Sequence, residues 1–272
     1  MTRLKPADVQ RIPRTLEKYE EELLKKTGCT LLEIAEDAAQ TNEHIETILR
    51  KTKGAVVPIT SGGGVIEGFA QAVTAIINHI GIRTTITQGT DVTGVAEAHE
   101  HGAGLMFLAD DRKFVAINLC TRQVVDNATS TAKAYVAALD KMANGLRGKP
   151  VLVIGIGNVG SQVISDLIQR KARPLAVDLD RTRLRALIKK YRGQVVAYNT
   201  VDEAISHTNL IINAAPTRNI LSADMIKEDM FISAPAMPVG LTQAALRKVE
   251  HNLVHDPLQL GVATMAVEAC AN

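Results

Sequence analysis

A glycine-rich turn in the second half of the chain has the spacing of a phosphate-binding loop. From Val151 the sequence reads Val-Leu-Val-Ile-Gly-Ile-Gly-Asn-Val-Gly, an apolar strand followed by G-x-G-x-x-G, and a helix predicted over Ser161–Arg170 follows at once. In this motif the first glycine makes a tight turn, the second lets the backbone approach a pyrophosphate, and the third lets the helix pack closely on the strand. The start of the helix then offers free N–H groups to the phosphates. The predicted cofactor contacts of this turn are Gly155, Gly157, Asn158, Val159 and Gly160.

Asp178 identifies the nucleotide that this turn is expected to hold. It closes the second strand about 20 residues after the turn, so Val151–Asp178 has the form of a dinucleotide-binding βαβ unit. A carboxylate at that position can accept both ribose hydroxyls of NAD, whereas the phosphate of NADP would meet a like charge. Arg181 and Arg183 lie just downstream and could soften this preference, or could belong to an exposed helix face. The sequence predicts NAD.

Small residues and prolines mark the ends of two later strands. The stretches Asn213–Thr217 and Ser233–Pro238 could keep a crevice open for a flat ring. The alternative interpretation is that both stretches only form tight turns. The predicted cofactor contacts here are Ala215, Pro216, Ala234 and Pro235. His255, at a strand end near the expected crevice, is the one histidine placed for proton transfer, although a surface histidine is the commoner case. No metal site is predicted.

Composition sets the broad class of the protein. The chain has 272 residues, 46% hydrophobic and 22% charged, which is ordinary for a globular protein. A net charge of +2 and the absence of a Lys/Arg stripe argue against nucleic acid as a partner. The three cysteines lie far apart, and neither a signal peptide nor an apolar stretch of membrane-spanning length is present. We expect a cytoplasmic protein that is not bound to a membrane, and a homodimer is left open.

The first half predicts a helical arm joined to a small α/β domain. Apolar residues at Val9, Ile12, Leu16 and Leu23 share a helical face that Pro13 would kink, and Thr30 with Glu33 has capping-box spacing. Predicted strands and helices follow, and their ranges are 55–60 (strand), 65–80 (helix), 82–88 (strand), 91–101 (helix), 105–109 (strand), 114–119 (strand) and 127–146 (helix).

Gly148 and Pro150 end the last of these helices, so we place the domain boundary there. Short strands then alternate with helical stretches, the pattern of a doubly wound parallel sheet of the Rossmann type. The six predicted strands cover 151–155, 174–178, 195–198, 210–213, 230–234 and 253–255. The expected fold class is therefore α/β, with a substrate domain over residues 1–148 and a Rossmann NAD-binding domain over 149–272.

Three stretches outside the glycine motif are not general features of dinucleotide-binding proteins. They read Val57-Pro58-Ile59-Thr60-Ser61-Gly62-Gly63-Gly64; Leu108-Ala109-Asp110-Asp111 with Asn118-Leu119; and Pro257-Leu258-x-Leu260-Gly261-x-Ala263-Thr264. Together with the glycine motif between them they resemble the pyrrolysine synthase family. The resemblance runs from Leu4-x-Pro6-x-Asp8 to the last helix.

This resemblance implies an NAD-dependent oxidoreductase that acts on a CH–NH2 group in the last step of pyrrolysine synthesis. The implied substrate is an isopeptide, lysine acylated on its side-chain amine by methyl-D-ornithine. NAD takes a hydride from the carbon that bears the terminal amine of the ornithine part. The imine is then hydrolysed with release of ammonia, and the α-amine closes a five-membered pyrroline ring with loss of water.

The resemblance also implies roles for individual residues. Asp110 matches the acidic residue implicated in substrate binding and catalysis, where it would hold the amine and remove its proton. By its own spacing, however, Asp110-Asp111 reads as part of a hairpin turn. Leu4 matches a residue that reaches the substrate, and an apolar side chain packed at the terminus is the alternative.

Three further polar residues are candidates for substrate binding. Ser61 and Asn118 are plausible contacts that could equally cap turns. Asp256 stands where a compared family member carries Glu, which keeps the carboxylate but shortens the side chain. Two other functions stay open: another NAD(P)-dependent dehydrogenase of a small metabolite, and a non-enzymatic NAD-binding sensor.

Overall fold

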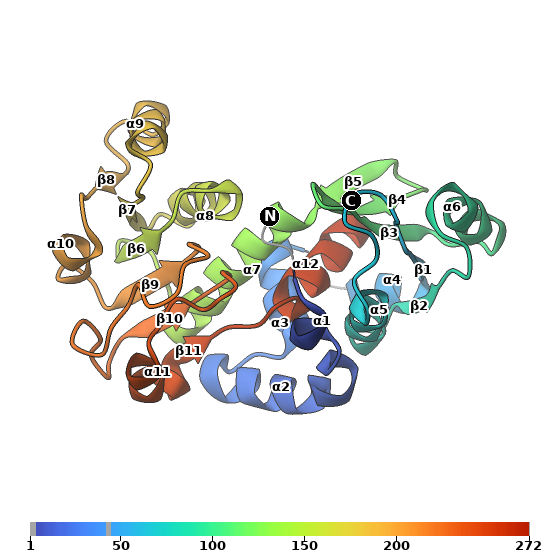
Figure 1. Cartoon of the computed structure of the whole chain (residues 1–272), viewed down its shortest axis with the longest axis horizontal. Coiled ribbons are helices and arrows are strands. Elements are labelled where there is room, and N and C mark those ends of the chain that lie inside the picture. Colours follow the sequence, from blue (N-terminus) through green and yellow to red (C-terminus); the bar gives the residue numbers. More distant parts are fainter. Residues whose placement is uncertain (1–3, 42–44, 272) are drawn as a thin grey trace. The chain divides into compact units, whose positions relative to one another are not determined.

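The computed structural model describes residues 4–41 and 45–271 (Figure 1). Internal contacts divide the chain into two compact units. The first comprises Met1–Leu24, Cys29–Ala134 and Pro257–Asn272, and the second Lys25–Gly28 and Tyr135–Asp256. The contacts thus divide the chain inside helix α7 (Asn127–Met142) and not at Gly148, the boundary expected from the sequence.

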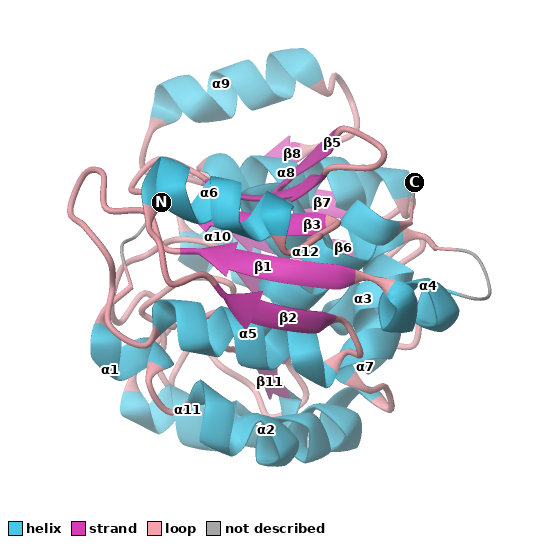
Figure 2. Cartoon of the chain, turned by 90° about the vertical axis from the view of Figure 1, so that its right-hand side faces the viewer, coloured by secondary structure: helices cyan, strands magenta, loops and turns pink. Residues whose placement is uncertain are grey.

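A mixed five-stranded sheet forms the centre of the first unit. Its three parallel strands lie at one side of the sheet, and two antiparallel strands complete it. In sheet order the strands are β2 (Arg83–Ile86), β1 (Lys53–Val57), β3 (Leu105–Ala109), β4 (Phe114–Asn118) and β5 (Gln123–Asp126). Figure 2 shows β1 and β2 side by side. Because β1, β2 and β3 are parallel, their carboxyl ends lie at one edge of this sheet.

The helices of the first unit agree largely with the periodicity of the sequence. Pro13 lies in the first turn of α2, which follows the short α1, and the capping box of Thr30 and Glu33 is present at the start of α3. The helices are α1 (Pro6–Val9), α2 (Ile12–Thr27), α3 (Leu31–Ala39), α4 (Ile45–Lys51), α5 (Phe69–His79), α6 (Asp91–Glu100) and α12 (Gln259–Cys270). Of these, α4 was not predicted, and neither was strand β5.

Helices cover both faces of this sheet. Ala55, Val57 and Met106 pack with Ala98 of α6 on one face. Side chains alternate along a strand, so the buried Val56 and Phe107 point to the opposite face, where α5 and α12 contact the strands. Helix α12 is almost wholly buried and contacts α3, α5 and β4, so the last helix belongs to the first unit and not to the Rossmann domain.

The second unit is the expected doubly wound parallel sheet. Its strand order is β11-β10-β9-β6-β7-β8, and all pairs are parallel. The strands are β6 (Pro150–Ile154), β7 (Arg173–Val177), β8 (Val196–Ala197), β9 (Leu210–Asn213), β10 (Phe231–Ser233) and β11 (Leu253–Val254). The order changes direction at β6, the first strand, and such a switch point is where open α/β sheets bind their ligands.

The connections between these strands are mostly helical. They comprise α8 (Asn158–Gln169), α9 (Arg181–Lys190), α10 (Val201–Ile205), α11 (Gln243–Val249) and the 3-10 turn η1 (Glu250–Asn252). Between β9 and β10 the expectation of a helical stretch is wrong. That segment forms turns, and Ile220 and Leu221 donate their N–H groups to the carbonyl of Gly240.

In the described part of the chain, no helix has the length and apolar character needed to cross a membrane.

Candidate functional site

The glycine motif connects β6 to α8, and two of its glycines are required by their surroundings. Gly155 has φ +86°, and a Cβ atom there would lie 2.8 Å from the backbone nitrogen of Ala215. A Cβ atom on Gly160 would overlap the carbonyl oxygen of Gly155. At Gly157 a Cβ atom would meet nothing within 4 Å, so the backbone borders open space there. This arrangement suits a pyrophosphate seated at the start of α8.

Asp178 lies directly after β7 and is tied to the same turn. Its Oδ2 accepts a hydrogen bond from the backbone nitrogen of Ile156 at 2.5 Å, and its Oδ1 accepts one from Asp180 at 2.7 Å. These two bonds fix the carboxylate beside the turn. Each oxygen keeps a second lone pair, and a ribose with two free hydroxyls could use them.

The two arginines downstream of Asp178 have partners of their own. Arg181 donates to the side-chain and backbone oxygens of Asn199 at 3.0 and 3.1 Å. Arg183 pairs with Asp180 at 3.2 Å, and both side chains of that pair are largely exposed. Each arginine thus has a partner within the protein, and the preference for NAD over NADP stays a prediction.

The predicted contacts at the ends of β9 and β10 follow the same edge of the sheet. The buried Asn213 donates to the carbonyl of Val239 at 2.9 Å and accepts from the backbone nitrogen of Ala215 at 3.2 Å, which fixes the chain as it leaves β9. Ala215 and Pro235 are half-buried, Pro216 is exposed and Ala234 is buried. Their contact with a cofactor stays a prediction.

In the first unit, two of the sequence motifs meet at the carboxyl ends of β1 and β3. Asp111 accepts a hydrogen bond through Oδ2 from the backbone nitrogen of Gly63 at 2.6 Å, across 48 residues of sequence. Gly62 has φ +71°, and a Cβ atom there would overlap the same carboxylate. A concave turn of backbone N–H groups is a binding site for anions, and here Asp111 supplies the anion.

Asp110 lies beside this contact, in the turn between β3 and β4. Its Oδ1 accepts backbone hydrogen bonds from Arg112 and Lys113, both at 2.7 Å. Those bonds, from Lys113 first and Arg112 second, lower the pKa of Asp110 below its usual value, so the exposed side chain is a carboxylate at neutral pH. The hairpin turn that the spacing predicts is thus present. Asp110 carries a fixed negative charge at this edge.

A second carboxylate holds the other side of the glycine-rich loop. Asp91 accepts from the backbone nitrogen of Thr60 at 2.8 Å and from its hydroxyl at 2.5 Å, and these bonds lower the pKa of Asp91. The backbone of Asp91 has φ +52°, an unusual conformation for a residue other than glycine. Ser61 lies between the two anchored positions, Thr60 and Gly63, and is exposed.

The structure does not bring Asn118 together with Asp110. Asn118 pairs with Leu105, the first residue of β3, whereas Asp110 follows its last residue. Its amide donates to the carbonyl of Ala269 and accepts from the backbone nitrogens of residues 120 and 121. We do not include it in the proposed site. Leu4 is half-buried, and its contact with substrate stays a prediction.

Asp256 lies in the second unit, directly after β11, and only 4% of its surface is exposed. The Tyr135 hydroxyl accepts from the backbone nitrogen of Asp256 at 2.9 Å and donates to its carbonyl at 2.7 Å. Burial, followed by the charge of Asp256, raises the pKa of Tyr135 well above its usual value. The sequence did not predict these hydrogen bonds between Tyr135 and Asp256, because Tyr135 has the spacing of an ordinary apolar position of a helix. Substrate binding by Asp256 stays a prediction.

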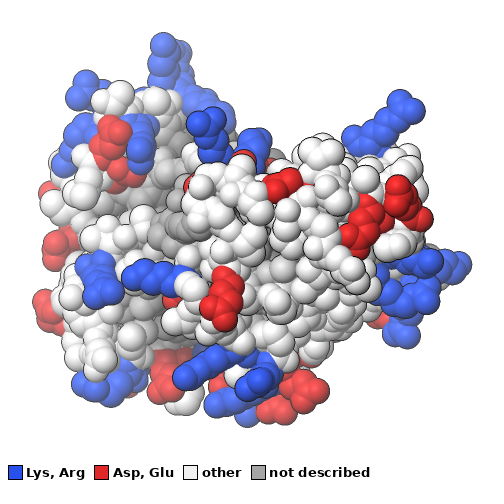
Figure 3. Space-filling view, turned by 45° about the vertical axis from the view of Figure 1, so that its right-hand side comes forward, with Lys and Arg blue, Asp and Glu red and all other residues white. Residues whose placement is uncertain are grey.

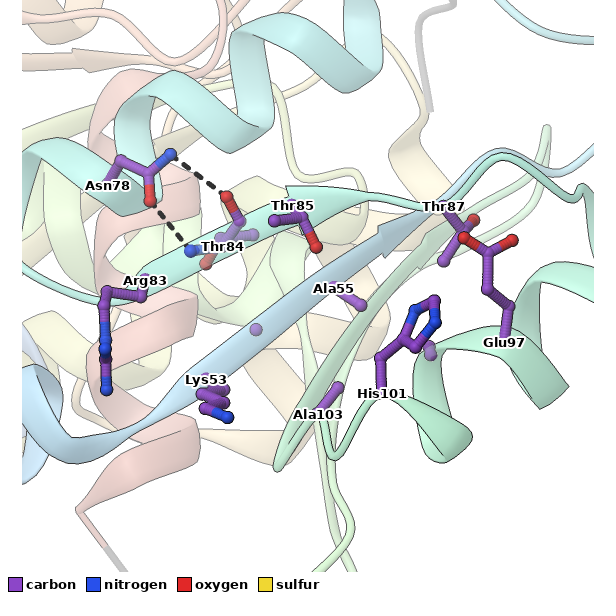
Figure 4. A pocket seen from close by; sticks show the side chains of 12 residues that line it. Lys53, Ala55, Asn78, Arg83, Thr84, Thr85, Thr87, Glu97, His101 and Ala103 are labelled. Carbon is purple, nitrogen blue, oxygen red and sulfur yellow. Dashed lines mark hydrogen bonds between the residues drawn. The ribbon is translucent and has the colours of Figure 1, made fainter.

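A hollow of about 440 Å³ lies beside β1 and β2 in the first unit (Figure 4). Several polar groups in its wall are already bonded within the protein. Asn78 exchanges hydrogen bonds with the backbone of Thr84, and Glu97, next to His101 in Figure 4, accepts from the backbone nitrogens of residues 88 and 89. None of the predicted site residues lines this hollow, so we assign it no part in the site.

Charged side chains are mixed on the surface. On the face drawn in Figure 3, basic groups lie in several places with acidic groups among them, and no continuous basic stripe is visible. Within residues 4–41 and 45–271, no group of three or more His, Cys, Asp and Glu side chains could hold a metal ion.

Comparisons with known proteins give a match for each half of the chain. Residues 8–125 match the family model of the N-terminal domain of pyrrolysine biosynthesis protein PylD, and residues 137–248 match that of shikimate/quinate 5-dehydrogenase. The pyrrolysine synthases of Methanosarcina barkeri and Methanosarcina acetivorans are 28% and 27% identical over 97% of this chain and 97% and 98% of their own. These matches confirm the resemblance that the sequence motifs indicated.

Solved structures agree on the fold. Quinate dehydrogenase from Corynebacterium glutamicum, solved in complex with NAD, aligns with a TM-score of 0.55 at 16% identity, over 80% of this chain and 92% of its own. Shikimate dehydrogenase from Aquifex aeolicus aligns with a TM-score of 0.55 at 14% identity, over 81% and 92%. The predicted fold class, a Rossmann-type domain with an N-terminal helical and α/β domain, is confirmed.

Proposed function

We propose that this chain, a homologue of the pyrrolysine synthases along nearly its whole length, is the NAD-dependent dehydrogenase that completes pyrrolysine synthesis. Its substrate is the isopeptide of lysine and methyl-D-ornithine. The reaction oxidises the carbon bearing the terminal amine of the ornithine part, releases ammonia and closes the pyrroline ring. The proposed enzyme is thus an oxidoreductase acting on a CH–NH2 group.

One observation carries the proposal beyond a general dehydrogenase. The Ser61–Gly64 loop and the Asp110–Asp111 turn are joined by the bond from Gly63 to Asp111, in the part of the chain that matches the PylD domain. A dinucleotide-binding unit by itself would fit many substrates. The loop and turn instead build a negatively charged edge next to polar backbone, which suits a substrate that carries ammonium groups.

NAD is the proposed cofactor. Gly155, Gly157 and Gly160 shape the turn for its pyrophosphate, and Asp178 would accept its ribose hydroxyls. The pairing of Arg181 with Asn199 supports NAD over NADP, because that guanidinium already has partners within the protein. Bound NAD supplies the hydride acceptor.

The protein's own residues bind and orient the substrate. The Asp110 carboxylate holds the ammonium by charge, and its position is fixed by two backbone bonds to Oδ1. Among the described residues, no other group hydrogen-bonds this carboxylate, so Oδ2 can accept from a ligand. Asp91 and Asp111 hold the loop that presents Ser61. Hydrolysis of the imine requires water and occurs after the hydride has left.

Incubation of the purified chain with NAD and the isopeptide tests the function. We expect NADH absorbance to rise and a product to form whose mass corresponds to loss of ammonia and of two hydrogen atoms. Shikimate and quinate, the substrates named by the second family model, should give no NADH. Reduction of NAD by quinate or shikimate, together with an inert isopeptide, would refute the proposal in favour of a dehydrogenase of another metabolite.

A matched pair of variants tests whether the charge of Asp110 is needed for turnover. Asp110→Asn should abolish most turnover while NADH still binds, because it removes the charge that holds the amine. Asp202→Asn removes one negative charge from an exposed helix position in the second unit and should leave turnover unchanged. Equal effects of the two substitutions would contradict the assignment of Asp110.

A further inference from the structure

The carboxyl edge of the second sheet is continuous from the glycine turn to His255. Backbone bonds tie each strand end to the next: Ala214 donates to the carbonyl of Ile154 at 2.8 Å, and Ala234 donates to that of Val254 at 2.9 Å. Between them, Ala236 donates to the carbonyl of Asn213 at 3.3 Å. His255 follows β11, which lies three strands from β6, about 14 Å at the usual strand spacing. It therefore lies on the opposite side of the glycine turn from β7 and Asp178, where the half of a bound dinucleotide beyond the pyrophosphate would lie.

The hydrogen bond of His255 sets its tautomer. Its Nδ1 lies 2.7 Å from the carbonyl oxygen of Ala234, and a carbonyl oxygen can only accept, so Nδ1 carries the hydrogen. In the neutral ring Nε2 then has a lone pair. Within the described part of the chain nothing hydrogen-bonds Nε2, and the side chain is half-buried. A neutral imidazole oriented by a backbone carbonyl, with its other nitrogen open, is a typical proton acceptor.

The backbone on both sides of His255 is held rigidly. Val254 pairs with Ser233 in the sheet, and the hydroxyl of Ser233 donates to the carbonyl of Tyr135 at 2.7 Å. After His255, the backbone nitrogen and carbonyl of Asp256 both bond the buried Tyr135 hydroxyl. The imidazole thus has a fixed position at the sheet edge, as a catalytic base requires.

We propose that His255 is the proton acceptor of the reaction, an inference that rests on the function proposed above. An N–H bond of the substrate ammonium breaks, the proton passes to Nε2, and the electron pair stays on the amine nitrogen. The amine loses one positive charge and the imidazole gains one. That electron pair could then form the C=N bond as the carbon that bears the amine loses its hydride, for which NAD, when bound, would supply the acceptor.

Asp110 is less suited to this step than an imidazole. Its two backbone hydrogen bonds stabilise the ionised form, so the carboxylate is a weak proton acceptor. A base works best when its pKa lies near the working pH, and imidazole in general meets that condition better than a carboxylate. The role of proton acceptor is therefore assigned to His255 and not to Asp110.

His255→Asn is the decisive variant, because the asparagine nitrogen can still donate to the Ala234 carbonyl while the Nε2 position is lost. We expect kcat to fall by about 10²-fold or more, in the range that a positioned base supplies. The Kd for NADH, measured by fluorescence titration, should stay within about twofold. His251→Asn, an exposed histidine four residues earlier, is the matched control and should leave both quantities unchanged.

Two measurements separate a base from a merely structural histidine. Added imidazole should restore part of the turnover of a His255→Gly variant, which a packing role would not allow. Nitrogen-15 NMR of the unliganded protein should show the Nδ1-protonated tautomer for His255, and this readout needs no substrate. The opposite tautomer would overturn the proposal.

The kinetic outcomes distinguish this proposal from the proposed function. An active wild type with near-normal kcat in His255→Asn would overturn the role of His255 alone. A fall in kcat matched by lost NADH binding would overturn it as well, since the residue would then position the cofactor. A wild type that does not oxidise the isopeptide would overturn the function itself, and this step with it.

Discussion

Asp178→Asn should shift the cofactor preference from NAD toward NADP. The carboxylate accepts from Ile156 at 2.5 Å through one oxygen and from Asp180 at 2.7 Å through the other. An asparagine has a single oxygen, so in either orientation its NH2 group faces one of these donors. The substitution thus removes the negative charge and one of the two oxygens that could accept from the ribose, while the side chain keeps its size.

The magnitude follows from these two losses. Loss of one hydrogen bond from the ribose to a charged acceptor costs NAD about 1.5 kcal/mol, the lower end of the range for such bonds. In the wild type, a phosphate of charge near −2 placed about 4 Å from Asp178 is repelled by about 2 kcal/mol, even in bulk water. Together they change the NAD-to-NADP affinity ratio by about 3.5 kcal/mol, a factor of about 300.

Fluorescence titrations with NADH and NADPH at fixed ionic strength measure this ratio. Asp224→Asn, in the segment between β9 and β10, serves as a charge-matched control and should leave the ratio unchanged. A wild type that binds NADPH more tightly than NADH would refute the reasoning. So would a ratio that moves by less than about tenfold in Asp178→Asn.

The other predictions concern single contacts. Gly160→Ala places a methyl group on the carbonyl oxygen of Gly155, so NADH and NADPH affinity should both fall by at least about tenfold in titrations; unchanged affinity would contradict the close approach. Gly62→Ala should displace the Asp111 carboxylate and speed hydrogen exchange of the Gly63 amide by about fivefold, equivalent to about 1 kcal/mol. In an Asp111→Ala background the same substitution should add little, and full additivity would argue against the contact. Asp110→Asn should lower kcat/KM for the isopeptide by up to about 10²-fold with NADH affinity unchanged, because a hydrogen bond to a charged group contributes up to about 3 kcal/mol, and near-normal kinetics would remove Asp110 from the site.

The features that the sequence determined by itself depend on near neighbours in the chain. The capping box of Thr30 and Glu33 is an exchange of hydrogen bonds three residues apart, and it forms as the spacing predicts. The glycine motif is equally local, because a strand, a tight turn and a helix start follow one another. A continuous apolar strand before the turn and a carboxylate after the next strand therefore sufficed to predict the βαβ unit.

Elements with few buried residues escaped prediction. Strand β5 has one fully buried side chain, Val125, so no alternation is visible over its four residues. Helix α4 has two, Ile45 and Leu49, which is too short a repeat to distinguish a helix from a loop. The turns between β9 and β10 differ from the expected helix because long-range backbone bonds to Gly240 hold that segment.

Only the tertiary structure decided which candidate residues could act together. The sequence places Asp110 and Asp111 in the same turn. Only Asp111 accepts the hydrogen bond from Gly63, so the two carboxylates have different roles. Asn118 belongs to the opposite edge of the sheet, because an antiparallel strand carries it away from Asp110. The tautomer of His255 depends on a carbonyl 21 residues earlier in the chain. Local spacing specifies turns and helix starts, but hydrogen bonds between distant segments exist only once the strands have paired.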